Sequence, residues 1–163
     1  MEFIVQFIAD GLLVIGILVA LGAFYFAVPK KKWKYWAIRI FGAGVTTYGL
    51  AKLIGWLYQP ETLRPFEKLG VDPGAMYLNN PGFPSDHVLF LTFLTLAVWF
   101  STRNKLLGAI MLLITLLTAI GRVLALVHTP LDVIGGMLIA LVGIIWYIPW
   151  GKHKRLVKNN IAK

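Results

Sequence analysis

The chain contains no cysteine among its 163 residues, which excludes disulfide bonds, thiolate nucleophiles and cysteine ligands for a metal. Acidic residues are also scarce, with 7 Asp and Glu against 16 Lys and Arg. In a soluble protein such a basic balance would suggest a nucleic acid partner. Here the cations gather at the ends of long apolar runs, so membrane topology accounts for them and no nucleic acid partner is expected.

Apolar residues make up 58% of the sequence, and the mean hydropathy is +0.75. Both values lie above those of soluble globular chains, so the bilayer is expected to act as solvent. Spanning segments are then helices or closed barrels, because the bilayer core offers backbone groups no water. The apolar runs are continuous rather than alternating, which favours helices. We expect an all-α integral membrane helical bundle, forming one domain over residues 1–163.

About five spans are expected, with six not excluded, because each apolar run is near the roughly 20 residues that a bilayer core requires. The candidate spans are residues 3–28, 35–58, 86–101, 105–127 and 130–149.

One long loop, residues 59–85, joins the second span to the third. It holds five of the eight prolines, and the segment 79–82 reads Asn-Asn-Pro-Gly, a turn signal. Residues 61–69 are expected to form a short helix on the surface.

The distribution of cations predicts the orientation of the chain in the membrane. Lys and Arg lie in the loop after the first span, in the loop after the third and in the tail 150–163. An odd number of spans places these three regions on one face, and the positive-inside rule makes that face cytoplasmic. The long loop is then extracytoplasmic. We expect a prokaryotic plasma membrane protein with a basic cytoplasmic tail.

Two cations lie inside predicted spans. Lys52 and Arg122 are each about six residues from the outer end of their span, and ionisable residues at such depth usually serve a function or have a partner. Both are expected to reach one outward-facing cavity. For Lys52 two interpretations stay open: it binds phosphate, or its ammonium reaches up to the outer interface.

The third span begins with Pro-Ser-Asp-His at residues 84–87. Ser85 or Asp86 is a natural N-cap. The free N–H groups of the first turn, with the positive end of the helix dipole, form an anion site. His87 lies in that turn, where an imidazole can exchange a proton with a bound phosphate group.

A second group of residues begins at Arg122, whose guanidinium suits phosphate oxygens. His128 follows at the outer end of the fourth span, with Asp132 four residues later. A carboxylate on one imidazole nitrogen makes the other nitrogen nucleophilic. Thr129, Pro130 and Asp132 also form a capping-box pattern, and this structural role and a catalytic one can coexist.

These residues resemble the signature of the type 2 phosphatidic acid phosphatase superfamily, which includes bacterial lipid phosphatases and vanadium haloperoxidases. The signature has three parts: Lys, six residues, Arg-Pro; then Pro-Ser-Gly-His; then Ser-Arg, five residues, His, three residues, Asp. The chain matches Arg-Pro at 64–65, Pro-Ser and His within 84–87, and the third part from Arg122 to Asp132. The resemblance covers residues 52–136.

Three positions depart from that signature. Leu57 stands where the family has its lysine, seven residues before Arg64, and Lys52 is the nearest cation. Asp86 replaces the glycine of the second part, a form similar to that of undecaprenyl diphosphate phosphatases. Gly121 replaces the serine of the third part, which removes a hydroxyl group.

The resemblance implies a metal-independent phosphatase that needs no cofactor. His128 would attack phosphorus and form a phosphohistidine, with Asp132 orienting it. His87 would protonate the leaving oxygen and then activate water. The residues expected to bind phosphate are Arg122, Arg64, Ser85 and Lys52.

The implied substrate is a phosphorylated lipid, since the site is expected to open at the membrane interface. Undecaprenyl diphosphate suits an outward-facing site, and phosphatidylglycerol phosphate and phosphatidic acid are alternatives. Two other function classes stay open. One is a zinc hydrolase using His87, His128 and Asp132, against which the two nearby guanidiniums argue. The other is a non-enzymatic module that binds or transports lipid phosphates.

Overall fold

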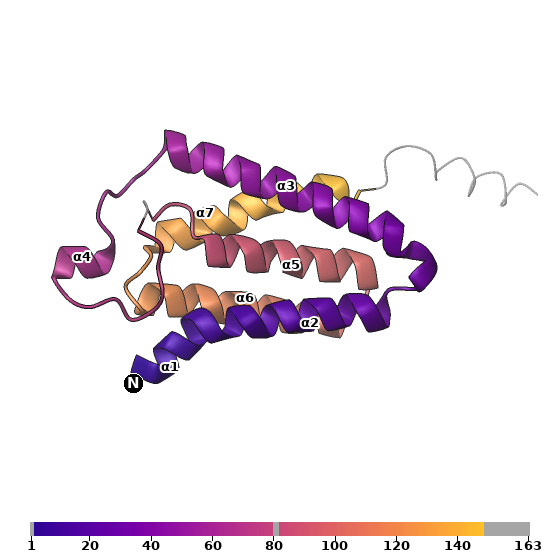
Figure 1. Ribbon diagram of the computed structural model, residues 1–163, viewed down its shortest axis with the longest axis horizontal. Helices are drawn as coiled ribbons and strands as arrows, with labels where there is room; N and C mark the ends of the chain where they lie inside the picture. The colour runs from indigo at the N-terminus through magenta and orange to yellow at the C-terminus, as the bar shows by residue number, and fades with distance from the viewer. Residues whose placement is uncertain (1, 80–81, 149–163) are drawn as a thin grey trace, which may run out of the picture.

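The structure is a computed structural model that describes residues 2–79 and 82–148, and every regular element in these ranges is a helix (Figure 1). In chain order the elements are α1 (Glu2–Gln6), the π-helix η1 (Phe7–Gly11), α2 (Leu12–Ala27), the 3₁₀ turn η2 (Lys30–Lys32), α3 (Trp33–Leu57), α4 (Pro65–Leu69), α5 (Asp86–Thr102), α6 (Lys105–Leu124), α7 (Pro130–Leu141) and the 3₁₀ turn η3 (Val142–Trp146).

The helices coincide with the five predicted apolar runs. Three are long and apolar enough to cross a bilayer: Glu2–Ala27, Lys30–Leu57 and Lys105–Leu124. Two further apolar helices, Asp86–Thr102 and Pro130–Trp146, are shorter. The all-helical class is therefore confirmed, and the chain has the helices of an integral membrane protein. The count of five spans stays a prediction.

The fourth run ends earlier than predicted. Helix α6 stops at Leu124 rather than at Val127. The reason is local: Leu126 adopts a left-handed backbone conformation with φ of 58°, which a helix cannot accommodate. His128 therefore lies in the turn between α6 and α7 and not at a helix end.

Two other boundaries differ as well. The short surface helix begins at Pro65 instead of at residue 61, because Pro65 occupies the first helical position, where its missing N–H costs nothing. In the fifth run the α-helix ends at Leu141 and continues as η3 to Trp146. Parts of three predictions lie outside the described residues: the end of the fifth run at 149, the basic tail 150–163, and positions 80 and 81 of the turn signal.

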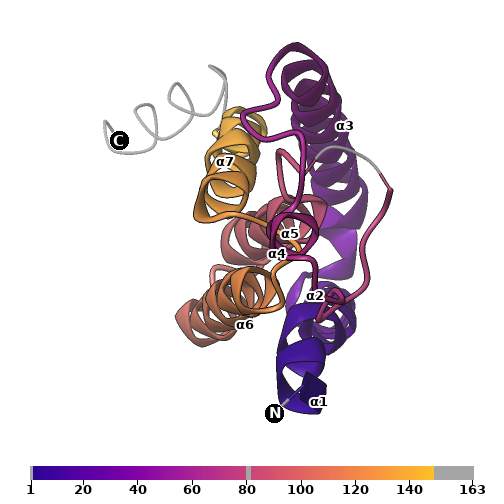
Figure 2. The same ribbon diagram turned by 90° about the vertical axis from the view of Figure 1, so that its left-hand side faces the viewer.

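Helix α5 occupies the centre of the bundle and contacts α2, α3, α6 and α7 (Figures 1 and 2). Helix α1, the segments 58–79 and 82–85 with α4, and the turn between α6 and α7 lie at one end of the bundle. The lysine turn η2 and the turn between α5 and α6 lie at the other end. All the residues of the phosphatase-like signature are therefore brought to a single end.

Glycines let α7 pack closely on the start of α5. A Cβ at Gly136 would lie 2.8 Å from the carbonyl oxygen of Ser85 and 3.2 Å from the nitrogen of Leu89. A Cβ at Gly135 would overlap the ring of Phe83. The absence of side chains at Gly135 and Gly136 therefore sets how near α7 comes to the first turn of α5 and to Phe83.

Candidate active site

The turn between α6 and α7, residues 125–129, anchors the segment that joins α3 to α5. The carbonyl oxygen of Leu126 accepts a hydrogen bond from the N–H of Phe66 at 3.0 Å. The carbonyl oxygen of Val127 accepts one from Nη1 of Arg64 at 2.5 Å. Main-chain groups thus hold Arg64 in place, and its guanidinium is buried beside the turn.

The first turn of α5 is tied to α7. The N–H of Ser85 donates to the carbonyl oxygen of Asp132 at 3.0 Å. Ser85 occupies the N-cap position, yet its hydroxyl makes no capping bond, and Oγ is buried without a hydrogen-bond partner among the described residues. The first helical bond runs from the N–H of Leu89 to Ser85, so the three N–H groups between them have no partner within the helix. This is the anion-binding end of a helix.

His128 and Asp132 form a buried pair. Nδ1 of His128 lies 3.5 Å from Oδ2 of Asp132, longer than an ordinary hydrogen bond. The same Oδ2 accepts the N–H of Thr129 at 2.8 Å, and Oγ1 of Thr129 accepts the N–H of Asp132 at 3.2 Å. The predicted capping box is therefore present, and it uses the carboxylate that faces His128. Because Asp132 lies on the Nδ1 side, Nε2 is the nitrogen available for reaction.

Burial changes the ionisation of the two groups that lie outside the spanning helices. It lowers the pKa of the His128 imidazole, and Arg122 and Arg64 lower it further, while Asp132 opposes the shift. Burial also lowers the pKa of Arg64, against the opposing effect of Asp132, yet a guanidinium stays charged at any physiological pH. His128 is thus held neutral beside fixed cations, which is the protonation state of a nucleophile.

Arg122 is 1% exposed and pairs with a residue that sequence reasoning did not single out. Its Nη1 donates to Oδ1 of Asp10 at 2.6 Å and to the carbonyl oxygen of Met76 at 2.8 Å. The N–H of Met76 donates to Oδ2 of Asp10 at 2.8 Å. Nε2 of His87 lies 3.5 Å from Oδ1 of Asp10. The available signal was a carboxylate inside the first apolar run, where a charge requires a partner.

Two departures from the signature meet at the edge of the site. Nζ of Lys52 lies 3.0 and 3.1 Å from the two carboxylate oxygens of Asp86, which replaces the family's glycine. The Lys52 side chain is 46% exposed. The ammonium of Lys52 therefore forms an ion pair with the carboxylate of Asp86 at the edge of the cavity. Asp86 is the first helical residue of α5, while Ser85 takes the N-cap position.

These side chains surround a cavity of about 670 Å³. Its acidic, basic and histidine lining residues are Asp10, Lys52, Arg64, Asp86, His87, Arg122 and His128. Five of the seven predicted site residues thus line one cavity, and the other two, Ser85 and Asp132, are buried next to them.

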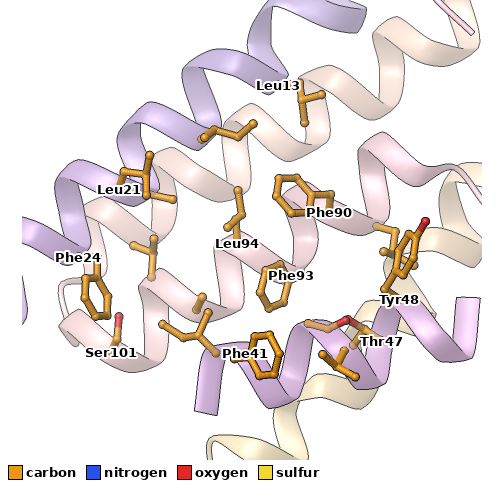
Figure 3. A pocket seen from close by; sticks show the side chains of 18 of the residues that line it. Leu13, Leu21, Phe24, Phe41, Thr47, Tyr48, Phe90, Phe93, Leu94 and Ser101 are labelled. Atoms are coloured by element: carbon orange, nitrogen blue, oxygen red, sulfur yellow. The ribbon is translucent and has the colours of Figure 1, made fainter. Parts of the chain in front are cut away.

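A second, apolar cavity of about 950 Å³ adjoins the first, since Leu13, Asp86 and His87 line both. It follows α5 between α2 and α3 as far as Ser101, and leucine and phenylalanine side chains cover its walls (Figure 3). Phe41 on its rim is 73% exposed, so the cavity opens sideways.

The zinc alternative gains no support from the geometry. Across residues 2–79 and 82–148, no group of three or more histidine or acidic side chains is arranged to hold a metal ion.

The comparisons with known proteins agree with the signature. The model of the PAP2 superfamily matches residues 31–156. No curated protein and no solved structure matches the chain. The match supports a phosphatase that hydrolyses a phosphoric ester or anhydride, and the apolar helices fit a lipid phosphate as its substrate. The match covers most of the sequence, and the chain therefore belongs to the PAP2 superfamily.

Proposed function

We propose that the chain is a lipid phosphate or diphosphate phosphatase that works through a phosphohistidine at the extracytoplasmic face of the membrane. The observation that carries this proposal is the buried pair of His128 and Asp132, whose imidazole lines a cavity together with the cations Lys52, Arg64 and Arg122. That cavity continues into an apolar one along α5. The phosphate and the lipid chain of one substrate therefore have adjoining places.

In the first step Nε2 of His128 attacks phosphorus. A P–N bond forms while the P–O bond to the leaving group breaks. The leaving group is a lipid alcohol when the substrate is a monophosphate and a lipid phosphate when it is a diphosphate. His87, as imidazolium, gives its proton to the leaving oxygen. Asp132 stabilises the positive charge that develops on His128.

In the second step the neutral His87 takes a proton from water, whose oxygen attacks the phosphohistidine. The P–N bond breaks, inorganic phosphate is released and His128 returns to its starting state. His87 thus recovers from water the proton that it donated to the leaving group. The proposed reaction uses no metal ion or other cofactor.

Buried polar atoms with unmet bonding capacity support phosphate binding. Nε of Arg122 and Oγ of Ser85 are buried and have no hydrogen-bond partner within the described ranges. A phosphate oxygen could accept from both. Arg64 adds a second guanidinium to the same cavity, and Lys52 lies at its edge. Preorganised donors of this kind stabilise the charge that builds up in phosphoryl transfer.

The apolar cavity supports a lipid substrate. Helix α5 has 17 residues. At about 1.5 Å per residue it is about 25 Å long, close to the thickness of a bilayer core. A long hydrocarbon chain bound along it would have its phosphate near His87. We propose undecaprenyl diphosphate as the substrate, with phosphatidylglycerol phosphate and phosphatidic acid as alternatives.

The two ends of the bundle support the orientation. The cationic turn η2 lies at the end opposite the site (Figure 1). By the positive-inside rule we expect that end to be cytoplasmic, which supports an extracytoplasmic site.

Phosphate release by the purified protein in detergent tests this function. The assay uses each of the three lipids with EDTA present, for the wild type and for His128→Ala. Lys68→Ala serves as the control, because Lys68 is a surface cation paired with Glu61 away from the cavity. We expect turnover in EDTA that His128→Ala abolishes and Lys68→Ala keeps. Binding of a lipid phosphate without any turnover would replace the enzyme by the non-enzymatic module.

A further inference from the structure

Asp10 is a carboxylate inside the phosphate site that the phosphatase signature does not include. It lies on the π-helical segment η1, before the residues that the family model matches. One of its oxygens, Oδ1, lies 2.6 Å from Nη1 of Arg122 and 3.5 Å from Nε2 of His87. These are the two groups expected to contact the phosphate and its leaving oxygen. Asp10 therefore occupies a position suited to a phosphate oxygen.

Gly121 explains how the first helix comes so near. A Cβ at this position would lie 2.8 Å from the backbone nitrogen of Ala9 and 2.9 Å from the carbonyl carbon of Ile8. Any residue other than glycine would push η1 away from α6. Gly121 stands where the signature has serine, directly before Arg122. The departure at Gly121 and the ion pair of Asp10 with Arg122 are thus parts of one arrangement.

The hydrogen bonds show which partner of Asp10 matters most. Arg122 is within hydrogen-bond distance, whereas His87 is not. The N–H of Met76 fixes the second carboxylate oxygen. A buried guanidinium is costly without a counter-ion, and Asp10 supplies that counter-ion when no phosphate is bound.

We propose that Asp10 is a resident anion of the phosphate site, which competes with substrate and product phosphate for Arg122. This inference rests on the proposed function for the identity of the site. A phosphate that binds Arg122 must either displace Asp10 or lie next to its like charge, and both weaken binding. The weakening applies to inorganic phosphate as well, so Asp10 favours release of the product.

Calorimetric titration of inorganic phosphate into the detergent-solubilised protein tests this role without requiring turnover. Asp10→Asn keeps the shape and removes the charge. Asp72→Asn removes the same charge from an exposed position in the outer loop. We expect Asp10→Asn to lower the Kd for phosphate by about tenfold or more, as a like charge at contact distance predicts. Asp72→Asn leaves the Kd unchanged.

Gly121→Ala gives an independent arm, since its Cβ moves η1 and separates Asp10 from Arg122 while both residues remain. We expect the Kd for phosphate to fall in this variant too. If Gly121→Ala does not fold, the Kd of Asp10→Asn by itself decides whether the proposal holds. A tighter complex is a gain that general structural damage does not produce.

An unchanged or higher Kd in Asp10→Asn overturns the proposal, as does an absence of phosphate binding by both it and the wild type. The proposed function fails separately, when the wild type hydrolyses none of the three lipids although Asp10→Asn binds phosphate more tightly.

Discussion

At the scale of single residues, the carboxylate of Asp132 makes two different contacts. It caps α7 by accepting the N–H of Thr129, and it lies beside Nδ1 of His128. The helix start therefore sets the position of the imidazole. Removal of the Thr129 hydroxyl and removal of the Asp132 charge should have separable effects.

Thr129→Ala is expected to lower the free energy of unfolding by about 1 kcal/mol, the usual cost of a lost N-cap, while most activity remains. Asp132→Asn is expected to lower kcat by roughly 10² to 10⁴, because the imidazole loses the charge that orients and stabilises it. Thermal unfolding in detergent and steady-state hydrolysis of the preferred lipid measure the two effects. Equal losses of kcat in both variants would contradict this division.

The lowered pKa of His128 makes a prediction about pH. A depressed pKa keeps the imidazole neutral, and so nucleophilic, to a lower pH than an ordinary histidine. The acid limb of kcat/KM that belongs to His128 should therefore lie below about pH 6.5, the usual histidine value. Loss of the Arg64 cation by Arg64→Gln should move that limb upward, because Arg64 helps to lower the pKa. A limb that stays fixed in this variant would contradict the assignment.

At the scale of helices, the contact between α7 and the first turn of α5 brings the two halves of the signature together. A Cβ at Gly136 would lie only 2.8 Å from the carbonyl oxygen of Ser85, so that contact depends on glycine. Gly49 offers a comparison, because a Cβ there meets nothing within 4 Å on the exposed side of α3.

Gly136→Ala is expected to separate α7 from α5 by a few tenths of an ångström or more and to lower kcat by about tenfold to a hundredfold, as small displacements of reacting groups do. Gly49→Ala should keep full activity and raise the free energy of unfolding by about 0.5–1 kcal/mol, the helix preference for alanine over glycine. Activity and thermal unfolding of both variants check this. Full activity in Gly136→Ala would show that the contact tolerates a methyl group.

The elements also show what the sequence could and could not predict. Hydropathy located the apolar helices because each run is continuous and local. The end of α6 was predicted wrongly because the helix stops before Leu126, which has a left-handed backbone conformation. Such a conformation is usually signalled by a glycine in the sequence, and position 126 is a leucine. The pairing of His128 with Asp132 could be predicted because the two residues are only four positions apart in the chain.

The partners that sequence reasoning missed are distant in the chain. Asp10 and Arg122 are 112 residues apart, and Lys52 and Asp86 are 34 apart. No periodicity links such pairs, so only the packing of the helices brings them together. Each was visible in the sequence merely as a charge at or within an apolar run.

At the scale of the whole molecule, the bundle has two chemically different ends. Helix α4 lies at one end, together with the residues that line the cavity of about 670 Å³, and the lysines of η2 lie at the other end. The absence of native cysteine makes this asymmetry testable, because any introduced thiol is the only one in the chain.

Thr62→Cys and Lys31→Cys place that thiol on exposed residues at opposite ends. In intact cells a membrane-impermeant maleimide is expected to label the thiol at position 62 and to spare the one at position 31. After permeabilisation both should react. Labelling of position 31 alone in intact cells would reverse the orientation and place hydrolysis in the cytoplasm.

The sideways opening of the apolar cavity near Phe41 bears on how such an enzyme must be measured. A molecule that arrives through this opening travels within the plane of the membrane and never crosses bulk water. Its encounter rate depends on its mole fraction among the surrounding amphiphiles, not on its molarity in the tube. Adding inert detergent at constant substrate amount should therefore slow the reaction by surface dilution, while the intrinsic turnover at saturating mole fraction stays the same.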